Sequence, residues 1–356
     1  MNIRNAFIIL SVTILLIIVG GGDFVQSVIA QNEEAFSTKL ITTEAELVER
    51  LEQAVAKGGY DEGLAMLKTT VEREPLNLPA RFFLATAYQT GGNYSQCIQE
   101  ARTAEQLKTI DDRLLGILWV CLYESGQKSE ALKTSGQAVN QFPESGESHR
   151  WHGISLLDEK KLDEASVHFQ KAITINPHDD TSLYMLAQTY RLRGYIVPSF
   201  LTYLRFLAVE PEGNRAQKAR TQFKTLVDSK LFIEFESETN FVAGLTVGPD
   251  GPIDEGDFSE AQKSLAVFAA PNNREPNLTS SKLQKTIEEV LKELPDKNSV
   301  SKGSFILQEI VPYLLAARNA KMIKGLAELV VMEDEPTPDA INFFKWSENY
   351  NWSKNN

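Results

Sequence analysis

The chain contains few of the residues that usually carry catalysis, metal binding or covalent cross-links. It has two cysteines and four histidines in 356 residues. Two cysteines do not form the dense disulfide framework that small secreted domains need, so we expect packing to stabilise the fold. The sequence also lacks the HExxH, GxSxG, CxxC and phosphate-loop motifs. We therefore expect no catalytic residue, no cofactor and no bound metal.

A basic excess is absent as well. The chain carries 36 Lys and Arg against 48 Asp and Glu, which gives a formal net charge of -12. Proteins that bind nucleic acids neutralise phosphates with a surplus of Lys and Arg, so we expect no nucleic acid partner. The 42% of apolar and 24% of charged residues are typical of a globular protein and exclude a disordered or polytopic membrane chain.

Long apolar runs are missing except near the N-terminus. Residues 1–30 contain one cation, Arg4, then an apolar run from Ala6 to Val19, then small residues. This order is typical of a secretory signal peptide, and it predicts cleavage after Ala30, a linker over 31–43 and a periplasmic or secreted protein. The alternative is an uncleaved inner-membrane anchor, because the apolar run reaches the low end of spanning length. A membrane partner is expected only in that case.

Prolines recur at a fixed interval in the first two thirds of the chain. Pro75, Pro143, Pro177 and Pro211 are separated by 68, 34 and 34 positions, and Thr109 occupies the skipped place. Seventeen positions before each of these five places the residue is glycine in four cases. Twelve positions before each of them the residue is always small. The two sets are Gly58, Gly92, Gly126, Lys160 and Gly194, and Gly63, Cys97, Ala131, Ala165 and Ser199.

Each feature of this period has a structural meaning. Glycine at a fixed position predicts a left-handed residue that ends a first helix. Small residues allow a second helix to pack closely against the first, and proline ends that second helix because its ring clashes with the preceding turn. Every period therefore predicts two helices and two turns.

This pattern resembles the tetratricopeptide repeat family, whose unit is a 34-residue helix–turn–helix. The resemblance covers five consecutive units, 44–77, 78–111, 112–145, 146–179 and 180–213. It implies a mainly α fold, a right-handed solenoid of five helix pairs, in an exported bacterial protein. It also implies that a peptide or partner protein binds in the concave groove lined by the first helices.

The groove-facing spacing of this family gives a candidate surface of aromatic, apolar and polar residues with two arginines. Aromatic and arginine side chains are typical hot spots of protein interfaces. The alternative is that aromatic residues at helical spacing pack in the core. The candidate groove comprises Phe82, Phe83, Thr86, Gln89, Val120, Tyr123, Arg150, Trp151, Ile154, Tyr184, Gln188 and Arg191, with Val48, Glu52 and Ile117 beside them.

The cysteines and two of the histidines fall inside the predicted helices. We expect Cys97 and Cys121 to be buried free thiols, and the alternative is that they pair in an oxidising compartment. His149 and His152 lie three residues apart on one helix, which is a spacing that two metal ligands can have. Because no third ligand is placed near them in the sequence, we expect packing histidines.

The 34-residue register ends at Asn214. Residues 214–230 predict a helix that caps the repeats. Within 231–277 we expect a β-hairpin from the runs 231–236 and 241–247, then a solvated acidic loop and a linker over 271–277. The acidic loop holds Asp250, Asp254, Glu255 and Asp257, whose spacing does not match an EF-hand.

Residues 278–356 predict a small α-rich region. Ser281 is expected to cap its first helix and Thr337 its last, and Pro312 is expected to kink or start a helix between them.

These observations predict a non-enzymatic adaptor or scaffold of the cell envelope that binds a partner protein or peptide. The alternative is an enzyme or a substrate-binding accessory whose active region lies within 232–356, with the repeats as a docking arm. The first interpretation predicts that Trp151→Ala and Arg150→Ala variants lose the partner. The second predicts a concave polar pocket outside the repeats.

Overall fold

The computed structural model is mainly α, as the sequence predicts. It describes residues 42–107, 110–227, 255–269, 279–295, 303–332 and 335–352. The predicted signal peptide, the β-hairpin and the linker over 271–277 lie outside these ranges. The chain divides into two compact units, one ending at Phe142 and one beginning at Pro143. Among the described residues, no helix has the length and apolar character needed to cross a membrane.

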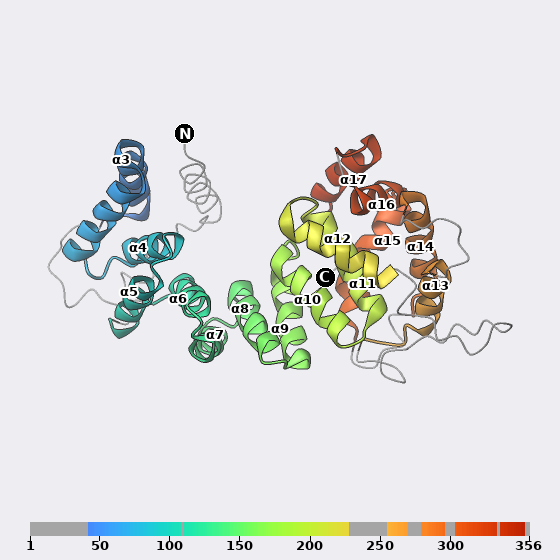
Figure 1. Cartoon of the computed structure of the whole chain (residues 1–356), viewed down its shortest axis with the longest axis horizontal. Helices are drawn as coiled ribbons and strands as arrows, with labels where there is room; N and C mark the ends of the chain where they lie inside the picture. Colours follow the sequence, from blue (N-terminus) through green and yellow to red (C-terminus); the bar gives the residue numbers. More distant parts are fainter. Residues whose placement is uncertain are drawn as a thin grey trace. The chain divides into compact units, whose positions relative to one another are not determined.

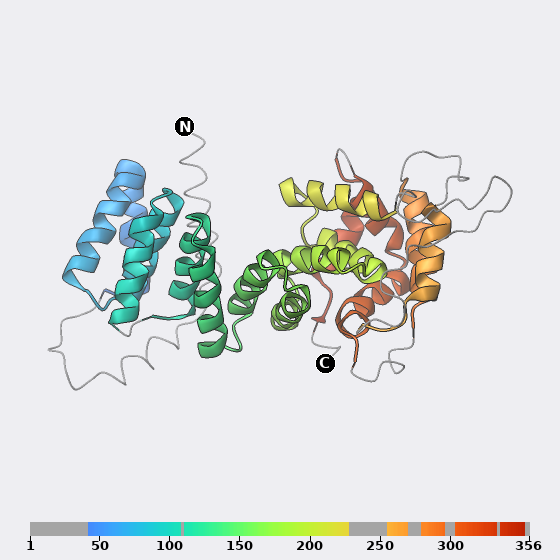
Figure 2. The ribbon, with the colours of Figure 1, turned by 60° about the horizontal axis from the view of Figure 1, so that its bottom comes forward.

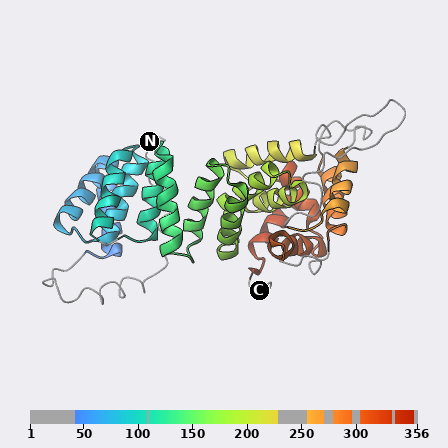
Figure 3. The same ribbon diagram turned by 90° about the horizontal axis from the view of Figure 1, so that it is seen from below.

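The first unit is a series of helical hairpins. Its helices are α3 (Glu44–Arg73), α4 (Leu78–Thr90), α5 (Tyr94–Gln106), α6 (Asp112–Glu124) and α7 (Lys128–Gln141). Each packs against the next one in the chain, so that they lie side by side in Figures 1 and 3. Helix α3 contains both helices of the first hairpin. The two helices meet at a sharp bend at Gly59.

Residues with left-handed backbone make the turns inside the hairpins. Gly92, Gly126 and Gly194 have φ of 74°, 81° and 77°, as the sequence predicts. Lys160 adopts the same conformation with φ 60° although it carries a side chain, an arrangement that costs about 1 kcal/mol. In α3 the left-handed residue is Gly59, so the prediction of Gly58 was wrong by one position.

Cys97 of α5 and Cys121 of α6 form a disulfide with their Cα atoms 6.3 Å apart. The prediction of free thiols is therefore wrong, although both cysteines are completely buried as expected. Their positions explain the pairing, because the second helix of one hairpin packs against the first helix of the next. The disulfide thus joins two consecutive hairpins of the first unit.

The second unit combines the later hairpins with the C-terminal helices. Its elements are α8 (Gly146–Asp158), α9 (Leu162–Ile175), α10 (Asp180–Leu192), α11 (Ile196–Val209), α12 (Gly213–Val227), α13 (Ser259–Ala269), α14 (Ser280–Lys292), the π-helical turn η3 (Ile306–Ile310), α15 (Val311–Asn319), α16 (Ile323–Val331) and α17 (Pro338–Glu348). The first helices α4, α6, α8 and α10 begin 34 positions apart, which matches the unit length of tetratricopeptide repeats.

Helix α11 is the centre of the second unit. It contacts α10, α12, α13, α16, α17 and η3, and its residues from Val197 to Ala208 are all buried. Figure 2 shows α11 with α12 and the C-terminal helices around it. A helix that is apolar on all sides needs such a surrounding. The C-terminal helices therefore share one core with the last hairpin.

The ends of the C-terminal helices follow local chemistry. Thr337 caps α17 as predicted, since its hydroxyl accepts a hydrogen bond from the Ala340 N–H at 3.2 Å. The cap of α14 is Thr279 and not Ser281, so that prediction was wrong by two positions. Pro312 lies in the first turn of α15, directly after η3. Because proline has no N–H to donate, one hydrogen bond of the regular α-helix is missing here, and a π-helical turn precedes α15.

A buried carboxylate links the repeats to the C-terminal helices. Glu255 is only 3% exposed, so its assignment to a solvated acidic loop was wrong. One of its oxygens accepts hydrogen bonds from the Tyr190 hydroxyl and the Gln170 amide, and the other accepts from the Ser304 hydroxyl and the Ile306 N–H. These donors belong to α9, α10 and the start of η3. A buried charge requires such partners, so this carboxylate fixes the three elements together.

A buried arginine anchors the C-terminal end of the described chain. The Arg205 guanidinium lies 4.4 Å from the ring centre of Tyr313 and 3.9 Å from that of Trp352. One of its terminal nitrogens donates to the Pro177 carbonyl at 2.9 Å, and the other has no hydrogen-bond partner among the residues that the structure describes. Burial lowers the pKa of Arg205 to about 10. Stacking on the two rings therefore compensates part of the cost of burying this cation.

We predict that the Cys97→Ala, Cys121→Ala double variant lowers the free energy of unfolding of the first unit by about 3 kcal/mol, because the disulfide closes a loop of 24 residues in the unfolded chain. Urea unfolding followed by circular dichroism measures the change. The reduced parent protein is the control and should match the variant. Equal stability of the oxidised parent and the variant would contradict the prediction.

We predict that Glu255→Gln destabilises the second unit by about 3 kcal/mol, because an amide NH₂ would face groups that themselves donate. Hydrogen exchange in η3, α9 and α10 at increasing urea concentration measures the loss. The control is Glu260→Gln on α13, whose carboxylate is exposed and pairs with Lys263. The same exchange rates in both variants would show that Glu255 does not hold these elements together.

Candidate partner-binding surfaces

The predicted groove separates into buried and half-buried residues. Phe82, Phe83, Trp151 and Tyr184 are 5%, 6%, 8% and 7% exposed. Phe82 and Phe83 lie against each other with ring centres 5.6 Å apart, and Tyr184 lies 5.2 Å from Phe206 of α11. The prediction is corrected at these four positions. Their rings pack in the core, because a helix between two neighbours buries more than one face.

The other predicted residues of the first helices stay half-buried at positions that repeat. One position is occupied by Thr86, Val120, Ile154 and Gln188, and a second by Gln89, Tyr123, Leu157 and Arg191. Within each set, the residues are 34 positions apart along α4, α6, α8 and α10. We call these eight residues the first-helix surface; those of α4 and α6 belong to the first unit and those of α8 and α10 to the second, and each unit carries its own part. Leu157 was missed in the sequence analysis, although its place one repeat after Tyr123 would have identified it.

The first-helix surface mixes apolar side chains with hydrogen-bonding groups. Val120, Ile154 and Leu157 offer apolar contact, and Gln89 and Gln188 carry amides that both donate and accept. In the first unit the Tyr123 ring stacks on Trp119, with ring centres 4.9 Å apart. An extended or helical peptide requires this combination, because its side chains need apolar contacts and its polar groups need partners.

Arg150, a predicted hot spot, is held in ion pairs. Its guanidinium lies 3.1 Å from the Asp179 carboxylate and 3.3 Å from that of Glu147. Asp179 also caps α10, since it accepts a hydrogen bond from the Ser182 N–H at 3.1 Å. Loss of Arg150 would leave the buried Asp179 carboxylate without its cation. Arg150→Ala and Trp151→Ala are therefore tests of stability and not of binding.

Arg191 differs from Arg150 because it has no acidic partner among the described residues. Its Nε atom and the Tyr203 hydroxyl are buried, and neither has a hydrogen-bond partner within the described parts of the chain. Burial raises the pKa of Tyr203 to about 12, and the nearby Arg191 guanidinium opposes that rise. Because the unpartnered Nε atom is buried, it is not open to a partner. Arg191 therefore belongs to the predicted surface only as a half-buried side chain beside Tyr203.

Three of the four histidines form a packed cluster on α8 and α9. Nδ1 of His149 lies 2.9 Å from Nδ1 of His168, and the His152 ring packs edge-on against the His168 ring. Burial and the neighbouring imidazoles lower the pKa of His168 to about 4. The positions equivalent to His149 and His168, two repeats earlier, hold the Arg81–Glu100 ion pair. No group of three or more His, Cys, Asp or Glu in the described parts of the chain could hold a metal ion.

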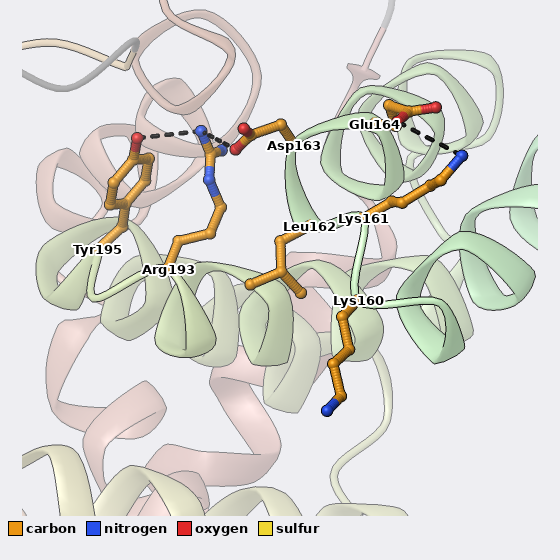
Figure 4. Close-up of a pocket in the computed structure, with 7 residues that line it drawn as sticks. All are labelled: Lys160, Lys161, Leu162, Asp163, Glu164, Arg193 and Tyr195. Atoms are coloured by element: carbon orange, nitrogen blue, oxygen red, sulfur yellow. Dashed lines mark hydrogen bonds and ion pairs between the residues drawn. The ribbon is translucent and has the colours of Figure 1, made fainter.

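A polar depression of about 420 Å³ lies at the hairpin turns of the second unit (Figure 4). The Arg193 guanidinium lies between the Asp163 carboxylate at 2.9 Å and the Tyr195 hydroxyl at 3.0 Å. Lys161 pairs with Glu164, and Lys160 points away from these groups. Apart from Lys160, the charged residues of this depression pair with one another, and its described lining contains no serine, threonine or cysteine. This arrangement is a structural ion-pair network.

A second concave site, of about 550 Å³, lies among the C-terminal helices. We call it the C-terminal cleft. Its lining is mainly apolar, with charged residues among it. It is lined by Val209, Glu210, Pro211, Glu212, Leu329, Met332, Pro336, Ala340, Ile341, Phe344, Lys345 and Glu348.

Comparisons with known proteins give similarities to solved structures only. No protein-family model matches the chain, and no curated protein matches it. The tetratricopeptide protein YrrB, described as having an unusual peptide-binding site, aligns at 16% identity over 56% of this chain and 100% of its own, with a TM-score of 0.40. PilF of Pseudomonas aeruginosa aligns at 19% identity over 52% and 88%, with a TM-score of 0.44.

A tetratricopeptide repeat protein from Parabacteroides merdae aligns at 15% identity over 86% of this chain and 99% of its own, with a TM-score of 0.42. All three TM-scores are low. The assignment of the hairpins to the tetratricopeptide type therefore rests on their 34-residue step and on their left-handed turns.

Proposed function

We propose that the chain is a non-enzymatic adaptor of the cell envelope that binds a partner peptide or protein on the first-helix surface. The observation that carries this proposal is the recurrence of half-buried side chains at the same two positions of α4, α6, α8 and α10. Core packing alone would bury these positions or leave them uniformly polar. A mixture of apolar, hydroxyl, amide and guanidinium side chains at these positions is instead suited to a protein ligand.

The proposal of a non-enzymatic role is supported by the way the titratable groups are used. The Glu255 carboxylate accepts four hydrogen bonds from the protein, and both ring nitrogens of His149 have protein partners. A general acid or base must reach a substrate, and these groups are already occupied. They support the fold instead.

The proposed envelope location is supported by two features. Residues 1–30 have the order of a secretory signal peptide, with cleavage proposed after Ala30. The buried Cys97–Cys121 disulfide agrees with an oxidising compartment, because cytosolic thiols are kept reduced.

We predict that glutamate at the first-helix surface weakens partner binding by at least about tenfold in each unit separately. The variants are Val120→Glu with Tyr123→Glu for the first unit, and Ile154→Glu with Gln188→Glu for the second. Half-buried positions tolerate these changes better than the buried aromatic residues do. Affinity capture from envelope extract with quantitative mass spectrometry identifies the partner, and titration of that partner gives the Kd.

The matched control is Val167→Glu on the second helix α9, where the valine is 60% exposed. Circular dichroism and Tm establish that each variant is folded. Equal retention of the same proteins by the parent, both double variants and the control would refute the first-helix surface as the binding site.

A further inference from the structure

The walls of the C-terminal cleft belong to two well-separated segments of the second unit. One wall is the end of α11 and the turn into α12, residues 209–212. The other wall is α17, which contributes Ile341 and Phe344. Between the two walls the cleft is lined by Leu329 and Met332, at the end of α16. A volume of about 550 Å³ lies within the usual range for ligand sites, about 300–1,000 Å³.

Polar contacts hold the two walls in place. Arg220 of α12 donates to the Leu329 and Val330 carbonyls at 3.1 Å and to the Pro211 carbonyl at 2.6 Å. Helices α16 and α17 approach so closely that a Cβ at Gly325 would clash with the Asp339 carbonyl oxygen. The cleft is therefore formed by packed elements and does not depend on a ligand for its shape.

The cleft presents apolar side chains that the described chain leaves uncovered. Ile341 is 40% exposed, and Phe344 and Met332 are half-buried. Single exposed apolar residues are common on protein surfaces, but a concave group of them marks an interaction site. An apolar side chain of a partner would remove this surface from water.

The charges at the rim determine which partner fits. Glu212 and Glu348 are exposed, and Glu212 interacts with the Arg220 guanidinium behind the wall. Among the described residues that line the cleft, three are carboxylates, Glu210, Glu212 and Glu348, and one is a cation, Lys345. The net charge of the lining is thus negative, and a segment that carries lysine or arginine beside its apolar residue complements it.

We infer that the C-terminal cleft is a second docking site, which binds a segment of a partner protein with an apolar side chain next to a basic one. This site is separate from the first-helix surface and uses different residues. A chain with both sites can hold one partner at two points or two partners together.

Two fluorescein-labelled peptides of matched length test this inference on the full chain by fluorescence anisotropy. The first is Lys-Lys-Leu-Phe-Leu-Lys-Lys, and the second replaces every lysine with glutamate. The basic peptide should bind at least about tenfold more tightly than the acidic one. Ile341→Ser should weaken the basic peptide at least about fivefold. The Glu212→Gln, Glu348→Gln double variant should reduce the preference for the basic peptide.

Two controls separate the cleft from other surfaces. Val167→Ser removes an exposed aliphatic side chain outside the cleft and should leave the Kd unchanged. The Val120→Glu, Tyr123→Glu variant should also bind the peptide normally, so failure at this site and failure at the first-helix surface are distinguishable. Equal Kd values for the two peptides would overturn the inference, since the acidic rim would then not select the ligand. The same Kd in Ile341→Ser and the parent would also overturn it, since binding would then reflect only the overall charge of the chain.

Discussion

The second unit depends on the burial of one carboxylate. Glu255 has no charged partner among its hydrogen-bond donors, and it reaches α9, α10 and η3 at once. Because a buried charge is tolerated only where donors are fixed around it, the repeats and the C-terminal helices must be placed together. In the same unit α11 contacts α10, α12, α13, α16, α17 and η3, and α17 lies opposite the end of α11. The C-terminal cleft lies between these elements, where Arg220 holds its walls.

The repeat register explains both the core and the proposed binding surface. Each first helix buries one set of side chains against its neighbours, and the same 34-residue step keeps two other positions half-buried in α4, α6, α8 and α10. The residues at these positions can change without disturbing the core, and here they combine aliphatic, amide, phenol and guanidinium groups. A regular scaffold with variable residues at fixed positions is a general way to build a recognition surface.

Local patterns predicted much of the fold, and contacts between distant segments could not be predicted. The spacing of Pro, Gly and small residues gave the hairpins, because turns and helix ends depend on nearby residues. The disulfide was missed because pairing depends on which helices pack together. Glu255 was placed in solvent because its donors lie 49 to 85 residues away along the chain. Four of the twelve proposed site residues belong to the core. They were included because helical periodicity does not distinguish a buried ring, such as Trp151, from a half-buried neighbour, such as Ile154.

The most direct test of partner binding on the first-helix surface is a photocrosslinking scan in cells that produce the protein. Benzoylphenylalanine would be placed singly at Thr86, Val120, Ile154 and Gln188, which share one repeat position, and at Val167 on a second helix as the comparison site. The account predicts adducts with the same partner from at least two consecutive positions of the first set, and none from Val167. Adducts that form equally at Val167, or at none of the four positions, would contradict it.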